Sequence, residues 1–208
     1  MLEIRHITKN YEEVCAVDDI SFAVKDLERI SIQGESGCGK STLLGILAGL
    51  IMPDTGEVWM DGQKLPTEPH LRQMAMVFQD STLWNHMTIQ ENILFGSPQK
   101  NRGKRRKMAE ELADVFGIGG LLGRYPWQIS GGQAKRAAIA RAIACERKIL
   151  LLDEPFSNLD KEGRFRTIEA VRELCAGKCA VLLVTHSAKE AEMLCERHLF
   201  MEEGKLKT

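Results

Sequence analysis

Short stretches of alternating apolar and polar residues predict β-strands in the first third of the chain. The alternation runs through Leu2-Glu3-Ile4 and Ile20–Val24, as in antiparallel strands that bury one face. Two further runs, Arg29–Gln33 and Met74–Phe78, predict two more strands. Between them, Ser41–Leu50 carries leucine and isoleucine at helical spacing and predicts a helix with one apolar face.

The C-terminal part has a different pattern, in which apolar residues follow one another without a break. Ile149–Leu152 and Val181–Val184 have the continuous apolar character of parallel strands that are buried on both faces. Helical patterns lie around them at Gly131–Cys145, which is rich in alanine, Arg164–Leu174 and Ala188–Cys195. Because strand and helix alternate here, the sequence predicts a parallel α/β sheet.

The segment from about residue 80 to 128 has few β-branched runs, many helix formers and several glycine breaks. It predicts a helical insert. The basic run Lys100–Lys107 lies within it and is followed by Glu110, Glu111 and Asp114. This run predicts a solvated helix face, and contact with anionic lipid headgroups is the alternative.

Composition narrows the class of protein. The 208 residues, 44% of them apolar, are enough for one well-buried domain. The net charge of −1 argues against a dedicated nucleic-acid-binding protein. No apolar run has the length of a signal peptide or a membrane span, so we expect a soluble chain whose membrane role would need a partner. The cysteines fit a reducing cytosol, and Cys175 and Cys179, four positions apart, lack the further Cys or His ligands of a metal site.

The segment Gly34–Thr42 matches GxxxxGK[ST] in full and lies between a predicted strand and a predicted helix. Its glycines allow backbone N–H groups to turn towards phosphate oxygens. Lys40 supplies positive charge to the terminal phosphates, and the Ser41 hydroxyl can ligate Mg²⁺. The helix that begins there adds the positive end of its dipole. The sequence therefore predicts a nucleoside triphosphate site.

An acidic pair closes the apolar strand Ile149–Leu152. Asp153 can hold the Mg²⁺ shell, and Glu154 can accept a proton from an attacking water. Alone, the pair has an acidic helix cap as a reasonable alternative, but beside a complete phosphate loop it favours catalysis.

A second glycine loop, Ser130-Gly131-Gly132-Gln133, precedes this strand. Three single residues, Gln79, His186 and Tyr11, are weaker candidates, since residues of these types are more often structural. Gln79 and His186 each follow an apolar strand, and Tyr11 could stack on a base.

Taken together, these motifs resemble the nucleotide-binding subunit of an ATP-binding cassette (ABC) transporter, over about residues 2–206. In the family's order, Tyr11 matches the adenine-stacking loop, Gly34–Thr42 the Walker A loop and Gln79 the glutamine loop. Ser130–Gln133 then matches the signature loop, and Ile149–Asp153 with Glu154 matches Walker B. Ser157–Asp160 matches the D-loop, and His186 the switch histidine.

The resemblance implies an α/β fold: a P-loop NTPase core with a mostly parallel sheet, an N-terminal antiparallel β subdomain and an inserted α-helical subdomain. It implies a single ABC ATPase domain over 1–208, with the core at about 1–80 and 146–208 and the helical subdomain, including the signature loop, at about 81–145. It also implies ATP and Mg²⁺ as cofactors and the activity of an ATP hydrolase.

The resemblance assigns a role to each matching residue. Glu154 is the general base, His186 contacts the γ-phosphate, and Gln79 senses Mg²⁺ and the water. Ser41, Gln79 and Asp153 are the metal ligands. Ser130–Gln133 would bind ATP held by the opposite subunit, so that two chains enclose two ATP molecules. The cofactor-binding residues are Tyr11, Gly34, Ser36, Gly37, Cys38, Gly39, Lys40, Ser41, Thr42, Ser130, Gly131, Gly132, Gln133 and Asp160.

Three positions depart from the family pattern. Ile129 replaces the usual leucine before the signature loop, Asn158 replaces the usual alanine of the D-loop, and Ser187 follows His186 where an aspartate is common. Asn158 could alter the coupling of subunits. None of the three removes a catalytic group, so the resemblance implies an active ATPase.

The segment Leu83–Ile93 resembles the importer-type form of the family, in which Trp84 and Met87 lie near the groove for a permease helix; packing of the helical insert explains them equally well. The implied partners are a second cassette, separate permease subunits and an extracytoplasmic solute-binding protein, with no nucleic acid. The implied place is the cytoplasmic face of the membrane. The chain ends about 20 residues after His186, so we expect the short form without a C-terminal regulatory domain.

Two alternative functions remain open at this point. One is a cassette that drives extrusion, lipoprotein release or cell division through a membrane complex. The other is a soluble ABC ATPase without a membrane partner, although the long coiled coil or second cassette of such proteins is not seen. The sequence does not identify a transported substrate.

Overall fold

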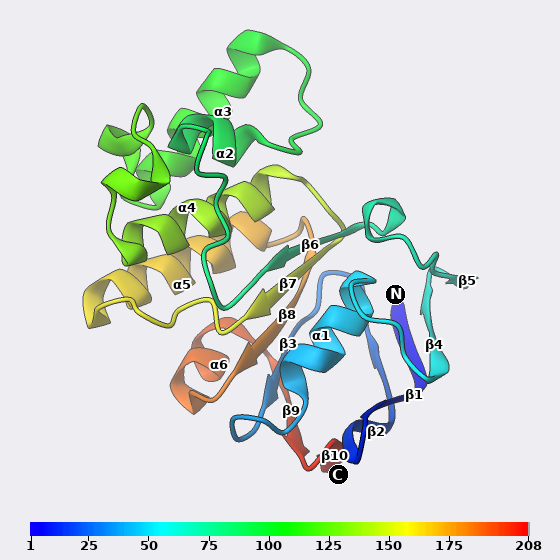
Figure 1. Cartoon of the computed structure of the whole chain (residues 1–208). Coiled ribbons are helices and arrows are strands. Elements are labelled where there is room, and N and C mark those ends of the chain that lie inside the picture. The colour runs from blue at the N-terminus through cyan, green and yellow to red at the C-terminus, as the bar shows by residue number, and fades with distance from the viewer. Residues whose placement is uncertain (208) are drawn as a thin grey trace.

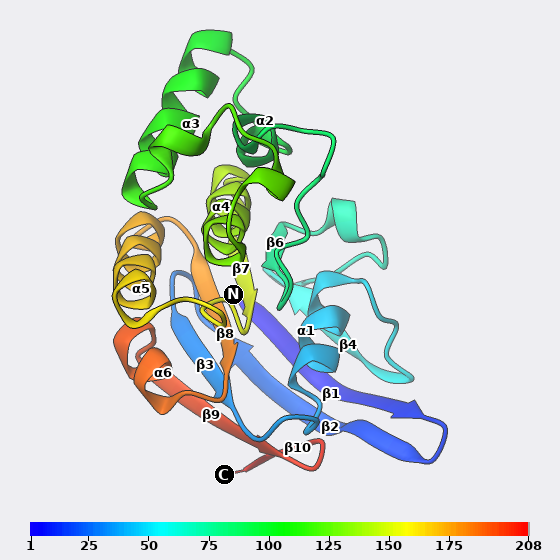
Figure 2. The ribbon, with the colours of Figure 1, turned by 60° about the vertical axis from the view of Figure 1, so that its left-hand side comes forward.

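The computed structural model describes residues 1–207 and places two β-sheets and a group of helices around one another. Figure 1 shows α2, α3 and α4 together in the upper part, above the strands. Figure 2 shows the larger, six-stranded sheet in the middle. Helices α5 and α6 cover one side of it, and α1 and the N-terminal strands lie on the other side. The arrangement is the α/β fold with an antiparallel N-terminal sheet that the sequence predicts.

The smaller sheet has the strand order β2-β1-β4-β5. Its strands are β1 (Leu2–Tyr11), β2 (Val14–Val24), β4 (Thr55–Met60) and β5 (Gln63–Lys64), all paired antiparallel. The alternation seen in the sequence puts Leu2 and Ile4 in the core, while Glu3 is half-buried and Arg5 is exposed. Both long strands extend beyond the predicted segments, because β1 and β2 continue through an irregular register after Ile4.

The larger sheet has the strand order β10-β9-β3-β8-β7-β6. Five of its strands are parallel, and β10 pairs antiparallel at the edge. Their bounds are β3 (Arg29–Gln33), β6 (Met74–Val77), β7 (Ile149–Asp153), β8 (Ala180–Thr185), β9 (Arg197–Glu202) and β10 (Lys205–Lys207). The sequence pattern did not predict β9 and β10, because both are short and only one of their residues, Met201, is fully buried.

A separate hydrophobic cluster lies on each face of the larger sheet. On β7, Ile149 and Leu151 join the cluster of α1 (Lys40–Ala48) and the smaller sheet. Leu150 and Leu152 join the cluster of α4 (Gly131–Ala144) and α5 (Lys161–Cys175). Because successive strand residues point to opposite faces, a continuous apolar run is needed to serve both clusters.

The remaining helices are α2 (Ile89–Leu94), α3 (Arg102–Val115) and α6 (Ala188–Leu194), with short 3₁₀ turns at Pro69–Leu71, Gly119–Leu121 and Pro126–Gln128. The basic run enters α3, where Arg106 pairs with Glu110 and Lys107 with Glu111 on the exposed surface. No helix within residues 1–207 is long and apolar enough to cross a membrane.

Candidate nucleotide site

The first glycine loop joins β3 to α1 and is held in place by close backbone contacts. Gly39 has a φ of 106°, and a Cβ there would lie 1.8 Å from the main-chain oxygen of Ala16. A Cβ on Gly34 would lie 2.1 Å from the main-chain oxygen of Met201. Only glycine fits so close to another backbone segment. The fold therefore requires glycine at these two positions even without a bound ligand.

Two side chains of this loop make directed contacts. Lys40 is 6% exposed, and its Nζ donates hydrogen bonds to the main-chain oxygens of Gly34 at 2.8 Å and Glu35 at 2.6 Å. Ser41 Oγ donates to Asp153 Oδ1 at 3.0 Å. The structure therefore brings together the start of α1 and the end of β7, as the sequence predicts for a phosphate loop and its acidic strand.

Asp153 lies in a poorly solvated position. Burial raises the pKa of its carboxyl above the ordinary value, and the hydrogen bond from Ser41 opposes that effect. A buried carboxylate with one hydroxyl neighbour is an oxygen-rich partner for a hard divalent cation, which would replace the lost solvation.

Glu154 and His186 meet at the ends of the neighbouring strands β7 and β8. Glu154 Oε1 accepts hydrogen bonds from the His186 main-chain N at 3.1 Å and from its Nδ1 at 2.9 Å. Glu154 has a φ of 44°, an uncommon value for a residue with a side chain. Its own main-chain N donates to Val184 at 3.0 Å, which holds this turn against β8.

These groups surround one cavity of about 300 Å³. It is lined by Ala16, Ser36, Gly37, Gly39, Lys40, Ser41, Thr42, Gln79, Glu154, Ser157, Val184 and His186. Asp153 contacts the cavity through Ser41, and Gly34 and Cys38 belong to the same loop without lining it. Sequence reasoning did not select Ala16, Ser157 or Val184; only Ser157, three residues after Glu154, lies in a motif that could have indicated it.

Lys135 is a functional candidate that the sequence did not reveal. It lies on α4, is 3% exposed, and its Nζ donates to the main-chain oxygens of Phe78, at 2.8 Å, and of Gln79. Burial lowers the pKa of its ammonium, which the nearby Asp153 and Glu154 partly offset. A buried cation thus ties the helix of the second glycine loop to the backbone of the glutamine loop.

The second glycine loop does not line this cavity in the described chain. It begins α4 instead: Ser130 Oγ accepts from the Gln133 main-chain N at 3.3 Å, and Gln133 Oε1 accepts from the Ser130 main-chain N at 2.9 Å. This reciprocal pair is a capping box. Figures 1 and 2 both show α4 among the upper helices and α1 in the lower part of the molecule.

The D-loop packs against this second loop. A Cβ on Gly132 would lie 3.3 Å from Leu159 and 3.4 Å from the Asn158 main-chain oxygen. Asn158 has a φ of 63°, which asparagine tolerates better than alanine does. Asp160 caps α5, and its Oδ1 accepts from the Gly163 main-chain N at 3.2 Å. Asp160 does not line the cavity.

Tyr11 also lies outside the cavity lining. It ends β1, is 45% exposed, and has the Lys9 ammonium 5.5 Å from its ring centroid. The exposed ring is available to stack on a base, but the structure does not place it against the phosphate loop Gly34–Thr42.

The donor set suits a phosphate chain and a hard cation. Loop N–H groups, the N-terminus of α1 and Lys40 provide positive charge. Ser41, Asp153 and Gln79 can provide oxygen ligands. No cluster of three or more His, Cys, Asp or Glu side chains that could hold a metal occurs within residues 1–207.

Comparison with known proteins agrees with this geometry. The sequence model of the ABC transporter family matches residues 17–157. The putrescine transport ATP-binding protein PotG of Escherichia coli is 40% identical over 99% of this chain and 55% of its own length. The xylose/arabinose import ATP-binding protein XacJ of Haloferax volcanii is 38% identical over 99% of this chain and 55% of its own.

Solved structures extend the comparison. The dimeric structure of the ATP-binding cassette MJ0796 in a post-hydrolysis state bound to ADP and Pi is 30% identical, with a TM-score of 0.89 over 100% of this chain and 97% of that one. A second dimeric structure of the same cassette gives a TM-score of 0.91. The chain spans a little over half the length of the two curated relatives named above, at 55% of each.

Proposed function

This chain belongs to the ABC transporter family, and on that premise we propose that it is the ATP-binding and ATP-hydrolysing subunit of a membrane transporter. The observation that carries the proposal is the contact of three segments in one cavity: the loop of Lys40, the strand end of Glu154 and the turn of His186. Phosphoryl transfer to water needs these parts, a phosphate cradle and a base held beside it.

Each of the predicted site residues has its own role in ATP binding or hydrolysis. Lys40 and the loop N–H groups bind the phosphates. Ser41, Asp153 and Gln79 would hold Mg²⁺, which would neutralise charge on the phosphate oxygens. Glu154 accepts the proton of the attacking water, and His186, hydrogen-bonded to Glu154, orients the terminal phosphate. Tyr11 covers the base.

A second chain completes the site. Because Ser130–Gln133 lies outside the cavity formed by its own chain, we assign it to the ATP of a second, identical or homologous cassette. Its serine hydroxyl, glycine N–H groups and helix N-terminus suit a terminal phosphate. We assign Asp160 to the same interface, because it is the last residue of the D-loop, whose Asn158 and Leu159 pack on Gly132.

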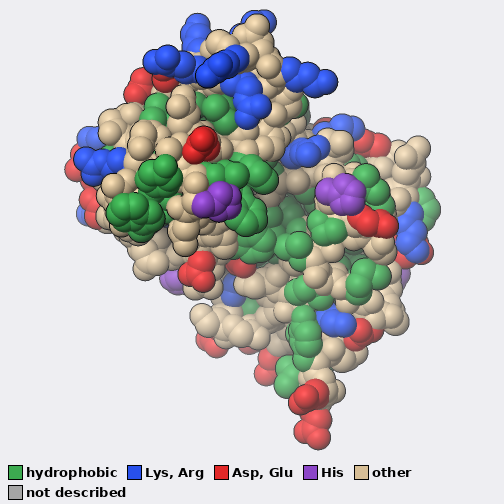
Figure 3. Space-filling model, turned by 45° about the horizontal axis from the view of Figure 1, so that its top comes forward, with side chains coloured by type: hydrophobic (Ala, Val, Ile, Leu, Met, Phe, Trp, Pro, Cys, Tyr) green, Lys and Arg blue, Asp and Glu red, His purple; other side chains and the backbone are tan. Residues whose placement is uncertain are grey.

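The remaining partners follow from the same family membership. We propose separate permease subunits and an extracytoplasmic solute-binding protein, with the chain acting at the cytoplasmic face of the membrane. Trp84 is 46% exposed and its ring lies 5.6 Å from that of Phe95, so Trp84 and the nearby Met87 are available to a permease helix. Figure 3 shows hydrophobic side chains gathered across the middle of one face, below Lys and Arg side chains at the top.

We propose that two units of the chain would move relative to one another. They are the core, at about 1–80 and 146–208, and the helical subdomain, at about 81–145.

Import of a small solute is the direction we propose, because the relatives that match this chain over nearly all its length are named as transport or import ATP-binding proteins. The test of the enzymatic part is phosphate release from ATP with Mg²⁺ and with EDTA, over a range of protein concentrations. We expect Mg²⁺-dependent hydrolysis that rises more steeply than the protein concentration. Strictly linear dependence down to low concentration would contradict the shared site.

A further inference from the structure

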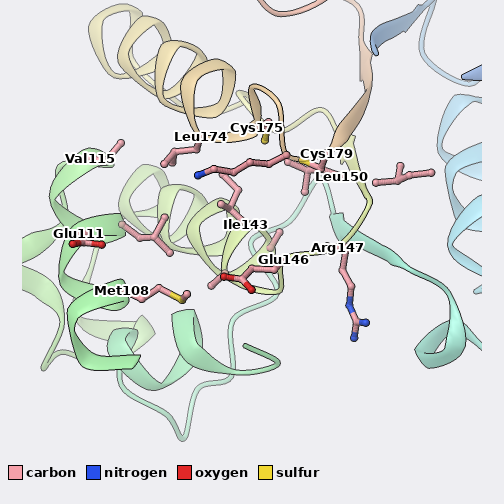
Figure 4. Close-up of a pocket in the computed structure, with 16 residues that line it drawn as sticks. Met108, Glu111, Val115, Ile143, Glu146, Arg147, Leu150, Leu174, Cys175 and Cys179 are labelled. Carbon is pink, nitrogen blue, oxygen red and sulfur yellow. The ribbon is translucent and has the colours of Figure 1, made fainter. Parts of the chain in front are cut away.

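A second cavity, of about 490 Å³, lies among α3, α4, α5 and the starts of β6 and β7. It shares no lining residue with the nucleotide cavity. Most of its wall is apolar, contributed by residues such as Met108, Ile143 and Leu174. Figure 4 shows the sulfur atoms of Cys175 and Cys179 close together at one side of it. These two thiols are the only cysteine side chains among the residues that line the cavity.

A tight turn brings the two thiols to the same side of the chain. Cys175 ends α5, and its main-chain oxygen accepts from Lys178 N at 3.0 Å and Cys179 N at 3.3 Å. Ala176 has φ −56° and ψ 122°, and Gly177 has φ 66°, which are the values of a type II turn. The reversal places both side chains on the same cavity.

The environments of the two thiols differ. Cys175 is 2% exposed, whereas Cys179 is only partly buried. The neighbouring Cys175 lowers the pKa of the Cys179 thiol, the charge of Lys178 acts in the same direction, and burial opposes both. The neighbouring Cys179 and burial together raise the pKa of Cys175. A partly exposed thiol with a lowered pKa beside a buried thiol is the arrangement that a reactive and a resolving cysteine need.

We propose that Cys175 and Cys179 form a peroxide-reactive dithiol that closes to a disulfide at the edge of this cavity. The Cys179 thiol ionises and its sulfur attacks a peroxide oxygen: an S–O bond forms, the O–O bond breaks, and the leaving hydroxide takes up the proton that Cys179 released, giving the first water. The sulfur of Cys175 then attacks the sulfenic sulfur: the S–S bond forms, the S–O bond breaks, and the leaving hydroxide takes the Cys175 thiol proton, giving the second water. Two thiols are oxidised and one hydrogen peroxide is reduced to two waters.

The sequence offers a direct assay, because trypsin cuts between the two cysteines. Cleavage after Arg172, Lys178 and Lys189 yields peptides 173–178 and 179–189, which stay joined only by a disulfide. The native chain is treated with hydrogen peroxide, alkylated in denaturant, digested without reductant and analysed by mass spectrometry. We expect the joined pair, two hydrogens lighter than the sum, which separates on reduction.

Variants and a control keep the test decisive. Cys175→Ser should stop at a sulfenic acid on Cys179 that dimedone traps, and Cys179→Ser should leave Cys175 reduced. The same peroxide dose given to the chain already unfolded in denaturant should yield much less joined peptide. The proposal is overturned if both cysteines stay alkylatable while Cys38 or Cys15 is oxidised, or if the unfolded chain forms the disulfide as readily as the native one.

Discussion

Glu154 accepts two hydrogen bonds from one residue, His186, through the same carboxylate oxygen. The 2.9 Å contact joins this oxygen to the ring nitrogen Nδ1, which donates to it when Nδ1 carries the ring proton. The main-chain contact at 3.1 Å holds the turn after β8 in register with the end of β7. The pair is therefore pre-organised across two strands.

Replacing Glu154 by Gln should remove the proton acceptor while preserving the shape of the site. We expect hydrolysis to fall by about 10²-fold or more, with ATP affinity nearly unchanged because the phosphate loop is intact. Single-turnover phosphate release and equilibrium nucleotide binding separate the two effects. Turnover at the wild-type rate in Glu154→Gln would show that Glu154 is not the general base. The matched control is Lys40→Ala, which should lose nucleotide binding.

Asp153→Asn should stabilise the free protein and abolish its response to Mg²⁺. The folded-state pKa of Asp153 is raised by burial, so its ionisation opposes folding above the unfolded value near 3.8. Removing the charge should therefore raise the free energy of unfolding at neutral pH. The gain should shrink below about pH 4, where the carboxyl is protonated in both states.

Thermal unfolding of wild type and Asp153→Asn, with and without ATP and Mg²⁺, measures both effects. A lower melting temperature for the nucleotide-free variant at pH 7 would show that Asp153 stabilises the fold as a charge. Retained stabilisation by Mg²⁺ with ATP would remove it from the metal site.

Much of this site could be predicted from the sequence because its parts are local. In Gly34–Thr42 and in Asp153-Glu154 the functional residues lie within a few positions of the end of an apolar strand. Their spacing in the sequence is therefore enough to indicate them. Lys135 could not be found in this way: a lysine in an alanine-rich helix resembles a solvated residue until the carbonyls of Phe78 and Gln79 are brought to it. The strands β9 and β10 were missed because their patterns are short and partly exposed.

Lys135→Met should weaken both the fold and the response to Mg²⁺. It removes the charged donor from the main-chain oxygens of Phe78 and Gln79, at a cost of about 1–3 kcal/mol, and it frees the backbone of Gln79. We expect a lower melting temperature and a higher Mg²⁺ requirement for hydrolysis, partly rescued in Lys135→Arg. Lys104→Met, on the exposed surface of α3, is the control. A Mg²⁺ requirement equal to wild type would leave Lys135 with a structural role alone.

Gly39→Ala should destabilise the nucleotide-free protein more than Gly37→Ala. Both positions have positive φ, so each substitution carries backbone strain of about 1–2 kcal/mol. Only at Gly39 would the new methyl group meet a backbone oxygen, that of Ala16 at 1.8 Å; a Cβ on Gly37 meets nothing within 4 Å. Chemical denaturation of the two variants compares them, and equal losses would mean that the contact with Ala16 relaxes freely.

The central claim is that the two glycine loops serve different ATP molecules, Gly34–Thr42 that of its own chain and Ser130–Gln133 that of its partner. The most direct measurement is the molar mass by light scattering of Glu154→Gln with ATP and Mg²⁺, with and without the added change Gly131→Asp, alongside the ATP affinity of the monomer. We predict a dimer for Glu154→Gln, a monomer after Gly131→Asp is added, and the same monomer affinity in both. A monomer affinity that falls with Gly131→Asp would place both loops on one ATP and contradict the account.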